Sequence, residues 1–235
     1  MKKILLFMIA ITCAASARAE EAADYRLDVH DFDQLKVTDA INVEYHCSED
    51  SAGWAYFTCP PSVAEHLLFS NNKSQLHIQV DLLQPVADDL PTLRVYSRTL
   101  SKVENSADCR ITVTDPQPVQ NFKARIVGNG MIVIKGLEAG SVDAGINTGK
   151  GHMVISGKAS RVKLSNVGTG PMEAGALQGA SVKVVLLGTG NVDCWATESL
   201  SVYGAGSGKI YYVGKPQKIV NRSLGVKAIE VGSEE

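Results

Sequence analysis

The stretch VKLSNVGTGPMEAGALQGASVKVVLLGTGNVDC, residues 162–194, holds one G-x-G turn at residues 168–170 and another at residues 188–190. Similar turns recur every 17 to 21 residues through the second half of the chain. Their glycines are Gly128, Gly130, Gly149, Gly151, Gly168, Gly170, Gly188, Gly190, Gly206 and Gly208, and residues 223–225 form a degenerate copy. Such a period, with short β-type runs between the turns, is typical of a β-solenoid, in which each coil buries its apolar face against the next.

The register of each coil can be counted from the second glycine of its turn. Positions two and four beyond that glycine are apolar in coil after coil, and we expect them to point inward because side chains alternate along a strand. These inward residues are Ile132, Met153, Met172, Val192 and Ile210 in one column and Ile134, Ile155, Ala174, Cys194 and Tyr212 in the other. The position between the columns is expected to face outward, and it holds Val133, Val154, Glu173, Asp193 and Tyr211.

Residues 20–104 lack the repeat, and we predict that they form a β-rich cap over one end of a solenoid at residues 105–235. An uncovered solenoid end would present an unpaired strand edge. Alternating runs predict separate strands at residues 35–37, 41–45, 54–57, 76–80 and 93–96. Ser62 and Glu65 have the spacing of a capping box, which predicts a helix of about two turns through Leu68.

Residues 1–19 have the pattern of a secretory signal peptide, with Lys2-Lys3 before an apolar stretch and Ala17-Arg18-Ala19 as the cleavage site. The pattern predicts export to the periplasm, the outer-membrane surface or the medium. Cys13 raises the alternative of a lipoprotein, but the preceding Ala10-Ile11-Thr12 differs from a bacterial lipidation signal. No later apolar run approaches the roughly 18 to 20 residues needed to cross a bilayer.

Cleavage of this signal would remove three basic residues and no acid, changing the formal net charge from −2 to −5. Nucleic acids are bound through clustered lysine and arginine, and the basic residues form no block along the sequence. We therefore expect no nucleic-acid partner.

Four cysteines would remain after cleavage, in a compartment where disulfides persist. Cys47 and Cys59 flank a polar turn between two predicted strands, so we expect a hairpin closed by a Cys47–Cys59 disulfide. Half a zinc site is the alternative, but no histidine or cysteine lies at ligand spacing around the pair. Cys109 and Cys194 fall four coils apart, which is about 19 Å at 4.8 Å per coil, and should stay free and buried.

The G-x-G turns, the secretion signal and the closing Tyr211-Tyr212-Val213-Gly214-Lys215-Pro216 resemble the family called putative auto-transporter adhesin, head GIN domain, of secreted and envelope proteins from Bacteroidetes and other Gram-negative bacteria. The resemblance covers roughly residues 28–216 as one continuous domain. The tripeptide Gly145-Ile146-Asn147 has the letters GIN of the family's name. It implies a right-handed parallel β-helix like that of pectin lyases and a role in adhesion. It carries over no catalytic residue.

Candidates for chemistry are few. An outward His152 could serve as an acyltransferase base, but the hexapeptide acyltransferases have a strict six-residue period that this chain lacks. A lyase-like site could use Asp143, Glu173 and Asp193 with the basic Arg161 and Lys163, although these acids lie on different coils. We expect neither a cofactor nor a metal site.

The sequence thus favours a non-enzymatic secreted or envelope protein that binds a glycan or a protein through the solenoid surface. A polysaccharide-active enzyme on a β-helix and a self-assembling envelope module are the alternatives.

Overall fold

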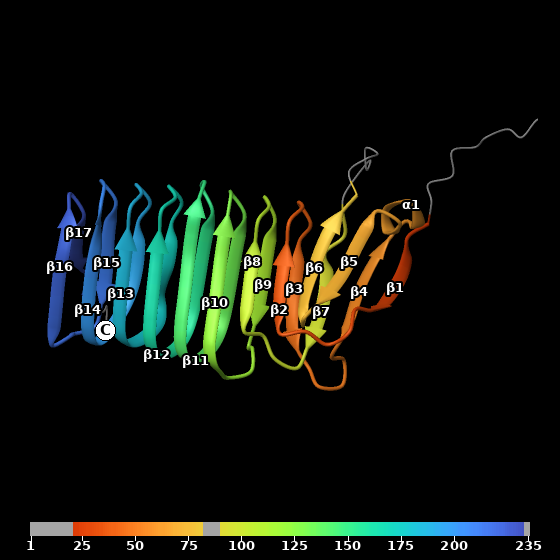
Figure 1. Cartoon of the computed structure of the whole chain (residues 1–235), viewed down its shortest axis with the longest axis horizontal. Coiled ribbons are helices and arrows are strands. Elements are labelled where there is room, and N and C mark those ends of the chain that lie inside the picture. The colour runs from red at the N-terminus through yellow and green to blue at the C-terminus, as the bar shows by residue number, and fades with distance from the viewer. Residues whose placement is uncertain (1–20, 82–89, 233–235) are drawn as a thin grey trace, which may run out of the picture.

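The computed structural model describes residues 21–81 and 90–232, which form a β-solenoid of two facing sheets (Figure 1). Each coil contributes one strand to the first sheet, here called sheet A, and one to the second, called sheet B. In spatial order, sheet A contains β5 (Leu67–Asn72), β6 (Gln75–Val80), β2 (Gln34–Val37), β8 (Lys102–Asn105), β10 (Val119–Val127), the second halves of β11 (Met131–Thr148), β12 (His152–Asn166), β13 (Met172–Leu186) and β14 (Val192–Ala205), and β16 (Lys218–Leu224).

Sheet B contains β1 (Ala23–Asp28), β4 (Trp54–Cys59), β7 (Leu93–Ser97), β3 (Val43–Cys47), β9 (Arg110–Thr114), the first halves of β11 to β14, β15 (Lys209–Val213) and β17 (Lys227–Glu230). Strands β11 to β14 bend from sheet B into sheet A, and each pairs in parallel with its neighbour along most of its length. The predicted β-solenoid is confirmed.

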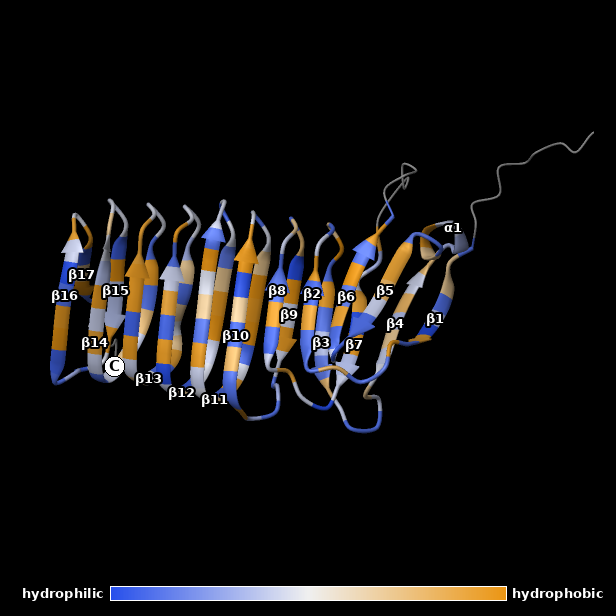
Figure 2. Cartoon of the chain, in the orientation of Figure 1, coloured by the Kyte–Doolittle hydropathy of each residue, from blue (hydrophilic) through white to orange (hydrophobic). Residues whose placement is uncertain are grey.

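Both predicted inward columns are buried, and they line the core between the sheets. The alternation is visible along the strands, where orange and blue bands follow one another (Figure 2). Val133 faces outward as predicted, but its side chain is only 8% exposed. Its register partners Thr112 and Val154 lie on either side of it, so neighbouring coils cover it.

The N-terminal region takes part in the solenoid itself. All five predicted strands are present, as β2, β3, β4, β6 and β7. The coil of β2 and β3 pairs in parallel with β6 and β7 on one side and with β8 and β9 on the other. The β6–β7 coil therefore stacks on the outer side of the β2–β3 coil, although it follows that coil in sequence. The predicted boundary between residues 104 and 105 falls within β8, which pairs in parallel with β10. The antiparallel strands β1, β4 and β5 cover the end.

The predicted two-turn helix is wrong in length. Helix α1 (Pro61–Ala64) is a single turn that starts with Pro61 and has Pro60 as its N-cap, without a side-chain capping bond. Leu67 and Leu68 belong to β5, because this segment pairs antiparallel with β6. In the described part of the chain, no helix has the length and apolar character needed to cross a membrane.

The cysteines correct one expectation and agree with another. Cys47 and Cys59 are free, because β7 lies between β3 and β4 and replaces the expected hairpin. Since β4 runs antiparallel to β7, Cys59 is displaced from the level of Cys47 by roughly 20 Å along the strands, beyond the reach of a disulfide. Cys109 and Cys194 are free and buried, as predicted. The predicted signal peptide, with Cys13, lies outside the described residues.

The second glycine of each turn is needed because neighbouring coils approach closely. A Cβ atom on Gly170, Gly190 or Gly208 would overlap the carbonyl oxygen of the second glycine in the preceding coil. Side chains are therefore excluded from this edge of the solenoid, and the coils can stack at strand spacing there.

Candidate functional site: a cationic groove along the solenoid

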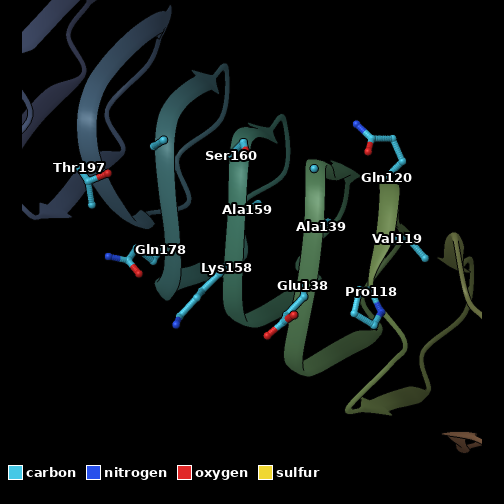
Figure 3. Close-up of a pocket in the computed structure, with 12 residues that line it drawn as sticks. Pro118, Val119, Gln120, Glu138, Ala139, Lys158, Ala159, Ser160, Gln178 and Thr197 are labelled. Carbon is cyan, nitrogen blue, oxygen red and sulfur yellow. The ribbon is translucent and has the colours of Figure 1, made fainter.

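An open groove of about 750 Å³ runs along the solenoid edge opposite the glycine turns. Ala139, Gly140 and Ala159 lie in it, at the points where the chain bends from sheet B into sheet A. Polar side chains flank these small residues, and Figure 3 shows Glu138, Lys158, Gln178 and Thr197 in a row from successive coils. The groove therefore presents a hydrogen-bonding side chain from each coil, about 4.8 Å from the next, and the row as a whole contains both donors and acceptors.

A second depression of about 650 Å³ adjoins the first and shares Val119 and Gln120 with it. It lies on the outer face of sheet A and is lined by Gln34, Lys102, Lys123 and Asp143 among others. Together the two depressions extend from β2 to β14, and we call them the coil-edge groove. Six coil steps separate these strands, which corresponds to about 29 Å.

Basic side chains gather on the outer face of sheet A, where Lys102 and Lys123 line the second depression and further cations lie on the adjoining strands. We call this set the cationic ladder, and it consists of Lys102, Lys123, Arg125, Arg161, Lys163 and Lys183. The parallel register places Lys102 beside Lys123 and Lys163 beside Lys183 on adjacent strands. Arg161 lies two residues before Lys163 and therefore on the same face.

Two carboxylates lie among these cations. Glu104 pairs with Lys36 at 3.2 Å and with Lys102 at 3.0 Å. Burial by itself would raise the pKa of Glu104, but these two ammonium groups outweigh it and hold the pKa below its ordinary value.

Asp143 forms ion pairs with Arg125 at 2.8 Å and with Lys163 at 3.6 Å. Its carboxylate oxygen Oδ2 makes both contacts, whereas Oδ1 is buried without a hydrogen-bond partner in the described structure. Asp143 thus neutralises the middle of the ladder and leaves the cations on either side of it.

Sequence reasoning missed the ladder because its members are about one coil apart in sequence. A search for contiguous basic blocks cannot find residues that only coil stacking brings together. The available signal was the repeat itself: Lys123, Asp143, Lys163 and Lys183 occur at 20-residue intervals, the period of the coils.

The structure divides the proposed lyase residues between two faces. Asp143, Arg161 and Lys163 lie on sheet A, whereas Glu173 and Asp193 are neighbours on the outer face of sheet B. His152 contacts Glu173, with 2.8 Å between Nε2 and Oε1. Among the described residues, no group of three or more histidine, cysteine or acidic side chains could hold a metal ion.

The carboxyl group of Asp193 has a raised pKa. Burial, followed by the charge of the adjacent Glu173, raises the pKa of this carboxyl. A smaller cavity of about 430 Å³, lined in part by Asp193 and Tyr211, lies at this part of sheet B.

Solved structures with the same architecture come from Bacteroides and Parabacteroides species. A protein from Bacteroides fragilis described as a putative adhesin has a TM-score of 0.83 and 21% identity, over 92% of this chain and 98% of that protein. One from Parabacteroides distasonis described as a putative lipid binding protein has a TM-score of 0.70 and 15% identity, over 90% and 98%. A putative adhesin from Parabacteroides merdae has a TM-score of 0.63 and 15% identity, over 90% and 97%. The TM-scores show that these proteins share the fold of this chain.

Among curated proteins, none matches this sequence. The family model described as putative auto-transporter adhesin, head GIN domain, matches residues 31–216 and so spans both the N-terminal coils and the glycine-turn coils. The chain therefore belongs to the putative auto-transporter adhesin, head GIN domain family.

Proposed function

We propose that this chain is a non-enzymatic, adhesin-like binding module of the cell envelope that holds an extended glycan in the coil-edge groove. The observation that carries the proposal is the shape of the groove, which crosses successive coils from Gln34 to Thr197. An open trough of about 29 Å is suited to a polymer rather than to a compact ligand.

The chemistry of the groove supports a glycan over a protein. Ala139, Gly140 and Ala159 let a polymer approach the backbone, and no large apolar anchor stands among them. Protein interfaces usually depend on buried aromatic or aliphatic anchors. Hydroxyl, amide, ammonium and carboxylate groups repeat along the groove instead, and they match a ligand rich in hydroxyl groups.

The same geometry argues against the lyase alternative, because its acids lie on opposite sheets. The descriptions of the similar proteins, two putative adhesins and a putative lipid binding protein, also support a binding role. Export by the predicted signal at residues 1–19 would bring the groove to surface glycans.

A steric block tests the proposal. Ser160 is exposed in the groove, so Ser160→Trp should weaken binding to extended glycans on an array by roughly tenfold or more, through lost access to the trough. Thr189→Trp adds the same bulk at an exposed position in a glycine turn and should leave binding unchanged.

Binding to no glycan on the array, or equal binding by both variants and the unmodified chain, would contradict a glycan site in this groove. Incubating bound polyuronates with the protein and following the ultraviolet absorbance of unsaturated product checks the enzymatic alternative. Product formation would overturn the non-enzymatic role.

A further inference from the structure

We propose that the ligand is an acidic polysaccharide, whose carboxylate or sulfate groups are neutralised by the cationic ladder. This inference rests on the proposed function, because it names the chemical class of the polymer in the same groove. The charges of the ladder support the acidic class, whereas the shape of the groove supports an extended glycan.

Like charges occupy adjacent positions in the ladder. Lys163 and Lys183 are direct register partners on β12 and β13, about 4.8 Å apart, as are Lys102 and Lys123 on β8 and β10. Directly opposed like charges destabilise a sheet. These positions face solvent and do not have to be basic, because the same column continues with Ser201 in the next coil. A bound polyanion would attract both ammonium groups of each pair and so offset the repulsion between them.

Several ladder charges are unneutralised in the protein itself. Within the described residues, Lys123 and Arg161 make no ion pair, and both are exposed. The ammonium group of Lys183 lies 4.9 Å from the ring centroid of Tyr203, a contact that leaves its charge uncompensated. The ladder therefore retains free cations on both sides of Asp143.

The acids and hydroxyls within the ladder favour a polysaccharide over a nucleic acid. Glu104 and Asp143 would repel an unbroken row of phosphates, but they can accept hydrogen bonds from sugar hydroxyls. Serine hydroxyls line the adjoining column, where Ser141 bonds Asn121 at 2.6 Å and Ser199 bonds Ser181 at 2.9 Å. A polymer with spaced acidic groups and many hydroxyls matches this alternation.

The test compares polymers that differ in charge alone. Polygalacturonate and the same polymer after reduction of its carboxyl groups are immobilised, and the binding of the full chain is measured at low and at moderate salt. Single-stranded DNA and heparin serve as further polyanions. The acidic polymer should bind more tightly than the reduced one, with affinity that falls steeply with salt because counterions are released.

Two double variants with the same net charge separate ladder contacts from general electrostatics. Lys163→Gln with Lys183→Gln should lower affinity for polygalacturonate roughly tenfold, by removing two anion contacts. Lys135→Gln with Lys209→Gln alters exposed lysines on sheet B and should have little effect.

Each remaining outcome is decisive. Equal binding to the charged and reduced polymers would overturn the acidic class while leaving the proposed glycan site standing. Tighter binding to DNA than to polygalacturonate or heparin would assign the ladder to nucleic acid and overturn the inference. Equal losses in the two double variants would show that no ladder site exists, and binding to no polymer would end both proposals.

Discussion

Asp193 is the residue with the clearest expected pH effect. Burial and then Glu173 raise its pKa in the folded chain, so the folded state holds this proton more tightly than the unfolded state does. Stability is therefore lost as pH rises through the native pKa, in a window that starts just above the ordinary value of about 4.

We expect Asp193→Asn to raise the thermal midpoint at neutral pH, with a gain that shrinks as the pH falls and Asp193 becomes protonated. Asp143→Asn serves as the control of opposite sign, because it removes contacts with Arg125 and Lys163. A lowered midpoint for Asp193→Asn at every pH would show that this carboxylate is stabilising.

The cysteines provide a second prediction for single residues. Burial raises the pKa of the Cys109 thiol to about 11 and that of Cys194 to about 12, and Cys59 is also buried with a raised pKa. Only the thiolate reacts with alkylating agents. Among the four described cysteines, we expect native alkylation near pH 8 to modify the partly exposed Cys47 alone.

Mass spectrometry of peptides after alkylation checks this result, and alkylation in denaturant without reductant should modify all four thiols. A linked Cys47–Cys59 peptide would contradict the strand order β4–β7–β3. A linked Cys109–Cys194 peptide would contradict the coil stacking.

Among the elements, the central coils should limit stability. Val184 is fully buried with coils on both sides, and Val184→Ala should cost about 2 to 4 kcal/mol through lost burial and a residual cavity. Val167 is 47% exposed just before a turn, so Val167→Ala should cost below about 0.5 kcal/mol. Chemical denaturation measures both, and equal costs would refute the inward register.

How far the elements could be predicted depends on what sets them. The glycine turns and the alternation around Ile155 are local signals, and they predicted the coils and their inward faces. Helix α1 was predicted too long because the pairing of Leu67 and Leu68 with β6 overrides a capping-box pattern. Alternation predicted the outward side of Val133, but it could not predict how deeply Val133 is buried there, which depends on Thr112 and Val154 in other coils.

At the scale of the whole molecule, prediction was limited by coil order. The sequence gives no sign that β6 and β7 stack outside β2 and β3, so the free Cys47 and Cys59 could not be foreseen. The cationic ladder has the same origin, since its charges are scattered in sequence and meet only when coils stack. The interior is therefore largely readable from local pattern, whereas the functional surface is a product of stacking.

If one polymer lies along many coils, its affinity must depend on its length. Calorimetry with a size series of acidic oligosaccharides, from disaccharides upward, measures this dependence. We expect affinity to rise with oligomer length until the ligand spans about 29 Å, the distance from β2 to β14, and to be constant beyond that length. An affinity that is already maximal for a disaccharide would contradict an extended site along the solenoid.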